Sequence, residues 1–345
     1  MLSDTAPLNQ YLSMPKVDLH RHLEGSLRLS TLVDIANQHG LALPVSLSKL
    51  SGLVQVQDQD PLTFSNFLEK FKTLRLFYRS PEVIQRITRE AVEDAAKDNI
   101  RYLELHFTPT ALSHAEGFPL NDVMDWVVAS ASQAAQEQGL KVGLIASVNR
   151  HERPELAGQV ARLAVEHKPH GLVGMDLAGN EAEFKAAPFY GIFREAWQAG
   201  LRITIHAGEW GPAANVKEAI QELCAERIAH GVRLMEDENV VALAKERGTA
   251  FEVCLTSNYQ SGVVPSLNQH PLPRMLDAGL NATLNTDDPG VSRITLSSEY
   301  QRACQDLKIP QGVLKETILA AAQAAFLPDE ERDKMVASLK AELAI

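Results

Sequence analysis

Cysteine is scarce in this sequence, and the few cysteines that occur are spread along it. Only Cys224, Cys254 and Cys304 are present. An odd number of widely spaced cysteines is typical of free thiols in a reducing compartment, and not of a disulfide framework. Cys254 lies in an apolar strand pattern, where a small buried core residue is expected. The cysteine content therefore predicts a cytoplasmic protein without disulfides.

Long apolar runs are missing as well. No segment approaches the roughly 20 consecutive apolar residues of a membrane-spanning helix. Residues 1–16 include Asp4, Pro7 and Gln10 and lack the apolar h-region of a signal peptide. We therefore expect no membrane span, no secretory leader and no membrane partner.

Basic residues are outnumbered by acidic ones. The chain has 33 Lys and Arg against 44 Asp and Glu, which gives a net charge of −11. A surface that binds nucleic acid needs clustered Lys and Arg to neutralise phosphates, so the composition argues against such a partner. The hydrophobic share of 45% is enough for a large core. Because no linker or change of composition interrupts the chain, we expect one domain over residues 1–345.

Residues 201–209 show how polar groups are distributed along this chain. The apolar stretch from Leu201 to Ile205 is typical of a buried strand. His206 and Glu209 follow it directly. A histidine and a carboxylate three residues apart, where a buried strand opens into a turn, can face the same small volume.

The same pattern recurs eight times. Strands that end in His, Asp, Asn or Gly alternate with helices, which predicts a parallel sheet closed into a single (β/α)8 TIM barrel. Extra helices are expected after the first strand and at the C-terminus. The active site of such a barrel lies at the carboxyl ends of its strands. The predicted strands are 17–22, 101–107, 141–148, 171–179, 201–209, 227–231, 249–258 and 281–288. The predicted helices are 28–39, one opened by Pro61 after an irregular excursion over 40–60, 81–99, 120–138, 155–167, one through Phe193 and Trp197, 215–225, 238–247, 272–278 and several within 297–345.

Three histidines and one aspartate gather at these strand ends. His20 and His22 are two residues apart on a strand, so both can enter the barrel mouth while Arg21 points outward. His206 ends the fifth strand and Asp287 the eighth, which lies beside the first in a closed barrel. Three imidazoles and one carboxylate leave room for a water, as in catalytic zinc sites. The set predicts one Zn2+ per chain, although other divalent ions also accept these ligands. The competing interpretation is that these are ordinary polar residues whose hydrogen bonds are satisfied at the ends of strands. This interpretation becomes weaker when the three histidines and the aspartate are considered together.

Two further groups belong to the same mouth. Water bound to zinc has its pKa lowered to about 7, and a neighbouring base can take its proton. Burial raises the pKa of a glutamate, and the protonated carboxyl can then donate to a ring nitrogen. His230, at the end of the sixth strand, and Glu209 are suited to these two tasks.

Four motifs, in this order, resemble those of the adenosine deaminase family within the metal-dependent amidohydrolases. Two further segments, MDLAG at 175–179 and CLTSN at 254–258, also match, so the resemblance covers nearly the whole chain. It implies a single zinc ion on the four residues named above. The four motifs are PKVDLHRHLEG at 15–25, HAGE at 206–209, RIAHG at 227–231 and LNTDDP at 284–289.

The resemblance also implies a reaction. Glu209 would protonate purine N1, and His230 would orient and deprotonate the metal-bound water. Hydroxide would attack C6 and ammonia would leave. Asp288 would contact N7, and the backbone of Gly179 would face N3. The residues that would contact the substrate are His22, Glu24, Gly179, Asp288, Phe64, Phe67 and Phe71.

The chain departs from the family pattern in two places. Glu24 stands where members that act on adenosine usually have Asp, and it resembles the adenine and aminodeoxyfutalosine deaminases there. His106 ends the second strand where Arg is more usual, and the sequence gives it no role. Residues 256–262, however, are similar to the adenosine branch.

The aromatic stripe after Pro61 has two interpretations. Phe64, Phe67, Leu68 and Phe71 recur at helical spacing, which is typical of core packing. The resemblance favours an apolar lid over the pocket. The other histidines receive no role in this interpretation: His39, His114, His151, His167, His170 and His270.

These observations predict a zinc-dependent deaminase of adenosine and 2′-deoxyadenosine. The expected partner is a small-molecule purine nucleoside, and the oligomeric state is left open. One alternative is a deaminase of adenine or of another 6-aminopurine. A second alternative is an inactive barrel used for binding, which would not require the four metal positions together with Glu209 and His230.

Overall fold

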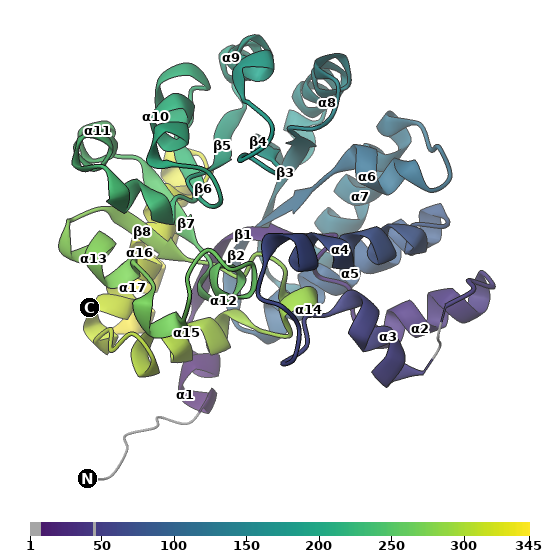
Figure 1. The fold of residues 1–345 in the computed structure, drawn as a ribbon, viewed down its shortest axis with the longest axis horizontal. Helices are drawn as coiled ribbons and strands as arrows, with labels where there is room; N and C mark the ends of the chain where they lie inside the picture. The colour runs from purple at the N-terminus through teal and green to yellow at the C-terminus, as the bar shows by residue number, and fades with distance from the viewer. Residues whose placement is uncertain (1–7, 44–45) are drawn as a thin grey trace.

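Eight parallel strands form the centre of the molecule, and helices surround them (Figure 1). The computed structural model describes residues 8–43 and 46–345. Neighbouring strands pair in the order β1 to β8, which confirms the predicted (β/α)8 barrel. The strands are β1 (Lys16–His22), β2 (Ile100–Phe107), β3 (Lys141–Asn149), β4 (Leu172–Ala178), β5 (Arg202–Ala207), β6 (Arg227–His230), β7 (Ala250–Val253) and β8 (Asn281–Leu284).

The barrel closes where the segment after β8 meets β1. Arg21 and Asp287 form an isolated parallel bridge. The backbone N–H of His22 donates to the carbonyl of Asp287, and the N–H of Asp287 donates to the carbonyl of His20, both at 2.8 Å. Asp287 is therefore the residue that joins the last strand to the first.

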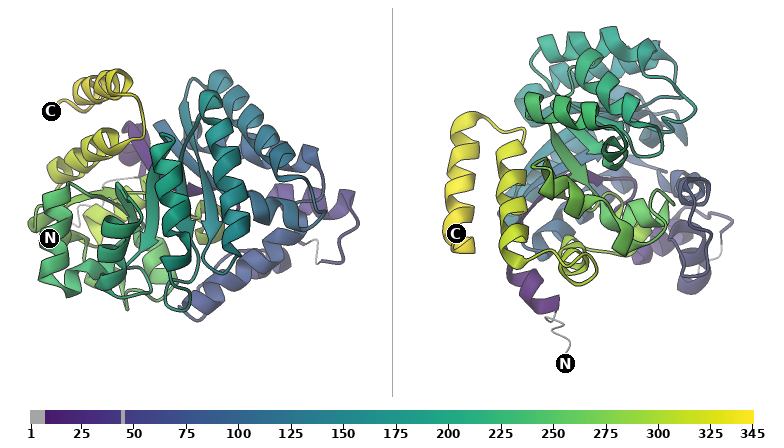
Figure 2. Two further views of the ribbon diagram at one scale, coloured as in Figure 1. Left: turned by 90° about the horizontal axis from the view of Figure 1, so that it is seen from above. Right: turned by 60° about the vertical axis from the view of Figure 1, so that its left-hand side comes forward.

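Extra helices lie where they were predicted, between β1 and β2 and after β8. Helix α16 packs against β8 and β1, and α17 lies beside it (Figure 2). The helices are α1 (Leu8–Ser13), α2 (Leu29–Gln38), α3 (Leu47–Val54), α4 (Phe64–Leu74), α5 (Pro81–Lys97), α6 (Pro109–His114), α7 (Leu120–Gln138), α8 (Pro154–Glu166), α9 (Tyr190–Gln198), α10 (Ala213–Glu222), α11 (Glu238–Arg247), α12 (Leu255–Gln260), α13 (Leu272–Asp277), α14 (Pro289–Ser292), α15 (Leu296–Gln305), α16 (Gln311–Ala324) and α17 (Asp329–Leu343).

Three local predictions need correction. Helix α4 begins at Phe64 and not at Pro61, because Thr63 is its N-cap and its hydroxyl accepts from the backbone N–H of Asn66. The excursion over 40–60 contains helix α3. Residues 256–258, expected as the end of a strand, lie in α12, whose first turn is held by Glu299.

An ionic network fills the barrel below its mouth. The Arg227 guanidinium pairs with Glu104 and with Glu252, and all three residues are buried. The same guanidinium lies 3.5 Å from the centre of the Phe326 ring, just after α16. Burial opposes ionisation, but the two carboxylates raise the pKa of Arg227. The interior of the barrel therefore contains buried ion pairs as well as apolar side chains.

Several expectations about cysteines and segments can be compared with the structure. All three cysteines are free thiols, and Cys254 is buried as predicted. Among the described residues, none of the helices combines the length and the apolarity that a membrane span needs. The expectation that residues 1–16 are no leader falls partly on residues 1–7, which lie outside the described residues.

Candidate active site

Four side chains meet at the carboxyl end of the barrel. His20, His22, His206 and Asp287 each offer one ligand atom, and these atoms lie within 4.8 Å of one another. The two Nε2 atoms of His20 and His22 are 3.1 Å apart. Oδ1 of Asp287 lies 3.4 Å from the first and 3.5 Å from the second. The structure therefore brings together the four residues that the sequence predicted as a metal site.

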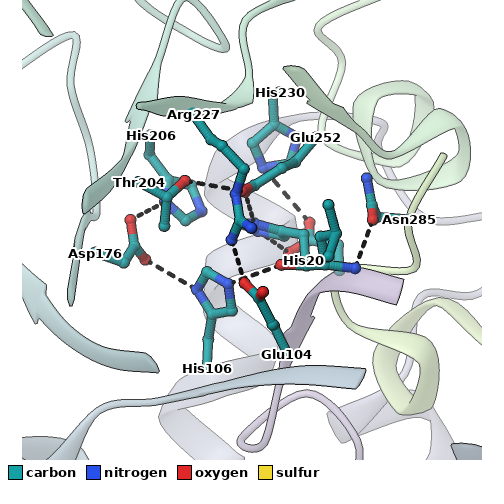
Figure 3. A network of polar contacts seen from close by, with 12 residues as sticks. His20, Glu104, His106, Asp176, Thr204, His206, Arg227, His230, Glu252 and Asn285 are labelled. Atoms are coloured by element: carbon teal, nitrogen blue, oxygen red, sulfur yellow. Dashed lines mark hydrogen bonds and ion pairs between the residues drawn. The ribbon is translucent and has the colours of Figure 1, made fainter. Parts of the chain in front are cut away.

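Buried carboxylates orient two of these histidines (Figure 3). Nδ1 of His20 lies 2.7 Å from Oε2 of Glu252, and Nδ1 of His206 lies 2.9 Å from Oδ1 of Asp176. Burial alone would raise the pKa of Glu252, but Arg227 and His20 lower it to about 2. An ionised carboxylate holds the proton on Nδ1, so the Nε2 lone pair is free for a metal. This donor set fits a divalent zinc ion.

His106, to which the sequence-based prediction assigned no role, lies beside His20. Its ring centre is 4.5 Å from that of His20. Its Nδ1 lies 3.4 Å from Asp176, and its Nε2 lies 3.2 Å from the carbonyl of Leu19. His106 thus contacts the carboxylate that orients His206. The sequence could not reveal this, because β2, β4 and β5 meet only in the closed barrel.

A cavity of about 360 Å³ opens beside the cluster. This volume is in the usual range for small-molecule sites. Phe67, Leu68 and Phe71 of α4 line it, whereas Phe64 does not and packs instead on Trp210, with 5.4 Å between ring centres. Other lining residues from the predicted set are His22, Glu24, Gly179, His206, Glu209, His230, Asp287 and Asp288.

Several lining residues escaped the sequence analysis. Asn149, His151 and Trp210 all face the cavity, and so do Tyr78 and Thr108. His151 carried no role in the sequence because it follows a strand by two residues and lies in no recognised motif. Tyr78 and Trp210 resemble ordinary core aromatics in the sequence, so no local signal could separate them.

Four buried polar atoms that line this cavity have no hydrogen-bond partner in the described part of the chain. They belong to Glu24 (Oε2), Tyr78 (hydroxyl), Trp210 (Nε1) and Asp288 (Oδ1). An unpaired buried polar group costs about 1–3 kcal/mol. Acceptors and donors left free around one cavity are what a polar ligand would satisfy.

Three titratable side chains beside the metal cluster have shifted pKa values. Burial, reinforced by the charges of Asp287 and Glu181, holds the pKa of Glu209 well above its usual range. Burial and the charge of Asp287 do the same for the pKa of Asp288. Burial lowers the pKa of His230 to about 3, so this ring is neutral. A neutral carboxyl and a neutral imidazole therefore face the metal cluster.

The backbone is strained at the same place. His230 and Asp287 have φ values of +60° and +63°, in the left-handed region that non-glycine residues rarely adopt. Gly25 is required by a close approach, since a Cβ there would lie 1.8 Å from Oδ1 of Asp288. The strained backbone conformations and the close approach at Gly25 are therefore all found around the cavity.

Glu181, which the sequence analysis did not single out, organises the turn that carries Glu209. It is 6% exposed. Its Oε1 accepts from the backbone N–H groups of Glu209, Trp210 and Gly211 at 2.6–2.9 Å. Its Oε2 accepts from the N–H of Gly208 and from the side chain of Asn215. One carboxylate thus satisfies four consecutive N–H groups.

Replacing Glu181 by alanine should therefore be strongly destabilising. Hydrogen bonds to a charged group contribute about 1.5–3 kcal/mol each, and several are lost at once. We expect a loss of at least about 3 kcal/mol in the free energy of unfolding, measured from urea denaturation. Glu183→Ala, two residues away and exposed, should cost under about 0.5 kcal/mol. Equal costs for the two variants would contradict this role of Glu181.

Comparison with known proteins agrees with the motifs. A family model described as adenosine deaminase matches residues 15–342. The adenosine deaminase of Shewanella loihica is 35% identical over 327 residues, which cover 94% of this chain and 98% of that protein. The crystal structure of an adenine deaminase from Arthrobacter aurescens has a TM-score of 0.88 and 26% identity, over 96% of this chain and 100% of that chain. An amidohydrolase from Burkholderia ambifaria with bound Zn has a TM-score of 0.90 and 25% identity, over 100% of this chain and 94% of that chain. With these matches, and with the predicted metal and acid residues gathered in one cavity, the chain belongs to the adenosine deaminase family.

Proposed function

We propose that this protein catalyses the hydrolytic deamination of adenosine and 2′-deoxyadenosine, giving inosine and 2′-deoxyinosine and releasing ammonia. The observation that carries the proposal is the position of the buried Glu209 carboxyl, whose pKa burial raises well above its usual range, in one cavity with three of the four cluster residues. The names of the relatives support the reaction class, because they include adenosine and adenine deaminases.

His20, His22, His206 and Asp287 would hold one zinc ion. When bound there, the ion supplies a nucleophile at neutral pH, because it lowers the pKa of water to about 7. The residues around the cavity carry out the other steps of the reaction. Water oxygen adds to C6 of the purine, and the bond from C6 to the amino group then breaks. One hydrogen of the water ends on the amino nitrogen, which leaves as ammonia, and the other restores the proton that Glu209 gives to N1.

The side chains around the cavity divide the remaining work. Glu209 donates its proton to N1 as the oxygen adds to C6, which makes C6 a better electrophile. Nε2 of His230 lies 3.8 Å from Glu209, and the His230 ring would orient the attacking oxygen. Asp288 and the backbone of Gly179 hold the purine from either side, at N7 and N3. Phe67 and Phe71 cover the ring and exclude water.

The substrate assignment rests on residues 256–262 and on the aromatic helix α4 beside the cavity, and Glu24 can supply a contact to the sugar. Its Oε1 accepts from the backbone N–H of Thr108 at 2.6 Å, while its Oε2 is one of the unpaired atoms of the cavity. The cavity lining continues past Glu24 to Lys72 and Arg75, where a group attached to the purine can lie. Oε2 of Glu24 is then placed to accept a hydrogen bond from a ribose hydroxyl. Residues 256–262 also favour the nucleoside.

Adenine or another 6-aminopurine, such as aminodeoxyfutalosine, is the second candidate. Glu24 itself favours it, because the usual residue at this position of the adenosine branch is Asp. The similarity to the adenine deaminase from Arthrobacter aurescens is the other observation in its favour. A spectrophotometric comparison of kcat/KM for adenosine, 2′-deoxyadenosine and adenine on the purified protein decides between them. A preference for adenine of tenfold or more would refute the nucleoside assignment.

Truncating Glu24 should separate the two substrates further. If Glu24 binds the sugar, Glu24→Ala leaves a buried ribose hydroxyl without its partner, which costs about 1–3 kcal/mol. We expect KM for adenosine to rise about 10- to 100-fold, since each 1.4 kcal/mol is a factor of ten. Turnover of adenine should change little. A similar loss for both substrates would show that Glu24 does not distinguish sugar from base.

A further inference from the structure

A chain of buried hydrogen bonds leads from the start of helix α13 to His230. The backbone N–H of Leu272 contacts Nδ1 of His270 at 3.1 Å. Nε2 of His270 contacts Oδ1 of Asn258 at 3.1 Å. The amide nitrogen of Asn258 contacts Nδ1 of His230 at 3.0 Å. The three side chains are 3%, 0% and 1% exposed, so water does not compete with these bonds.

The backbone N–H of Leu272, the first donor in this series of hydrogen bonds, fixes the direction of all the others. Leu272 is the first residue of α13, where a backbone N–H has no partner within the helix and can only donate. Nδ1 of His270 must therefore accept. Burial lowers the pKa of His270 to about 3, so its single ring proton lies on Nε2. That N–H donates to Asn258.

The amide of Asn258 carries the constraint to His230. Its oxygen accepts from His270, so its NH2 group points at Nδ1 of His230. The reversed amide would place NH2 against the N–H of His270, and two buried donors would then face each other without an acceptor. Nδ1 of His230 therefore accepts and carries no hydrogen, so the ring has its single hydrogen on Nε2.

We propose that Asn258 and His270 are positioning residues that hold His230 in the tautomer with its hydrogen on Nε2. Nε2 is the nitrogen on the side of the active site, 3.8 Å from Glu209 and 3.8 Å from Asp287. His230 then donates a hydrogen bond to the attacking oxygen and does not take a proton from it. This differs from the deprotonating role that the family resemblance implies. The kinetic consequence rests on the proposed function, whereas the tautomer does not.

The tautomer can be measured directly. In zinc-loaded protein labelled with 15N-histidine, two-bond 1H–15N correlation spectra distinguish the Nε2–H from the Nδ1–H form. His230→Gln identifies the signals of His230 by their disappearance. We expect the Nε2–H pattern for His230 and for His270. An Nδ1–H pattern for His230 would overturn the proposal, whether or not the protein acts on adenosine.

Variants test whether the chain of bonds sets the tautomer. His270→Leu removes the donor to Asn258, so the amide is free to reverse and His230 should show a mixture of tautomers. The rate constant kcat should fall in proportion to the fraction of His230 left in the Nε2–H form, roughly twofold for an even mixture, at unchanged zinc content and nearly unchanged KM. His270→Gln, whose amide nitrogen can replace Nε2, should restore both. His167→Gln is the matched control, because His167 is also buried and its ring bonds to Leu163 and Asp125, away from the chain of bonds that ends at His230. A pure Nε2–H form in His270→Leu would contradict the positioning role.

Discussion

His20→Ala and Asp287→Ala should each yield a protein without bound zinc and without measurable deaminase activity. Both side chains contribute to the four-residue cluster, and both are almost fully buried. Removing either leaves three ligands and an unfilled space, which cannot hold the ion with its intended geometry. Elemental analysis and the adenosine assay on the same preparations measure the two losses. Chelation of the wild type should have the same effect, and adding zinc should reverse it.

The control for this experiment is another buried histidine. His167→Ala removes another buried imidazole, 7% exposed, at the C-cap of α8. It should leave zinc content close to one ion per chain and activity close to that of the wild type. Wild-type activity in protein shown to contain no divalent metal would refute the proposed metal site. Zinc retained at full occupancy in His20→Ala would refute the ligand assignment alone.

Glu209→Gln should keep its zinc and lose most of its turnover rate. The side chain is not a member of the metal cluster, so the ion is unaffected. A glutamine cannot protonate N1, and general acid catalysis alone is worth about 10²- to 10⁴-fold. Hydrogen bonding to the developing intermediate adds to this loss. We therefore expect kcat to fall at least about 100-fold, measured by the change in absorbance as adenosine is consumed.

The same variant carries its own test of folding. Because Glu209 is held protonated, glutamine replaces a neutral group by a neutral group of similar shape. The urea midpoint should therefore change little, and a loss of rate cannot be assigned to unfolding. A kcat within a few-fold of the wild type would refute the role of Glu209 as the proton donor.

Local sequence signals predicted most of the barrel. Helix α7 ends as expected because Gly139 adopts the left-handed C-cap conformation that glycine favours. His20 and His22 share a direction because side chains alternate along a strand. Where two local signals compete, the boundary was wrong: Pro61 indicated the start of a helix that Thr63 caps.

Features that depend on distant partners could not be predicted. Helix α12 is held by Glu299, 43 residues further along the chain, and that contact exists only in the folded barrel. Glu181 and His106 act through backbone groups and carboxylates of other strands. Whether Phe64 or Phe71 faces the cavity depends on how α4 docks against the barrel, which helical periodicity does not determine.

Asp287, as the residue that joins the last strand to the first, also sets a limit on the order of folding. His20 and His22 of β1 leave the ribosome early, whereas Asp287 is made only after all eight strands. At about 5–20 residues per second, this delay is on the order of tens of seconds. During that time the nascent chain can hold no complete metal site. Closure of the barrel, and the binding of a metal by the proposed site, therefore follow the synthesis of all eight strands.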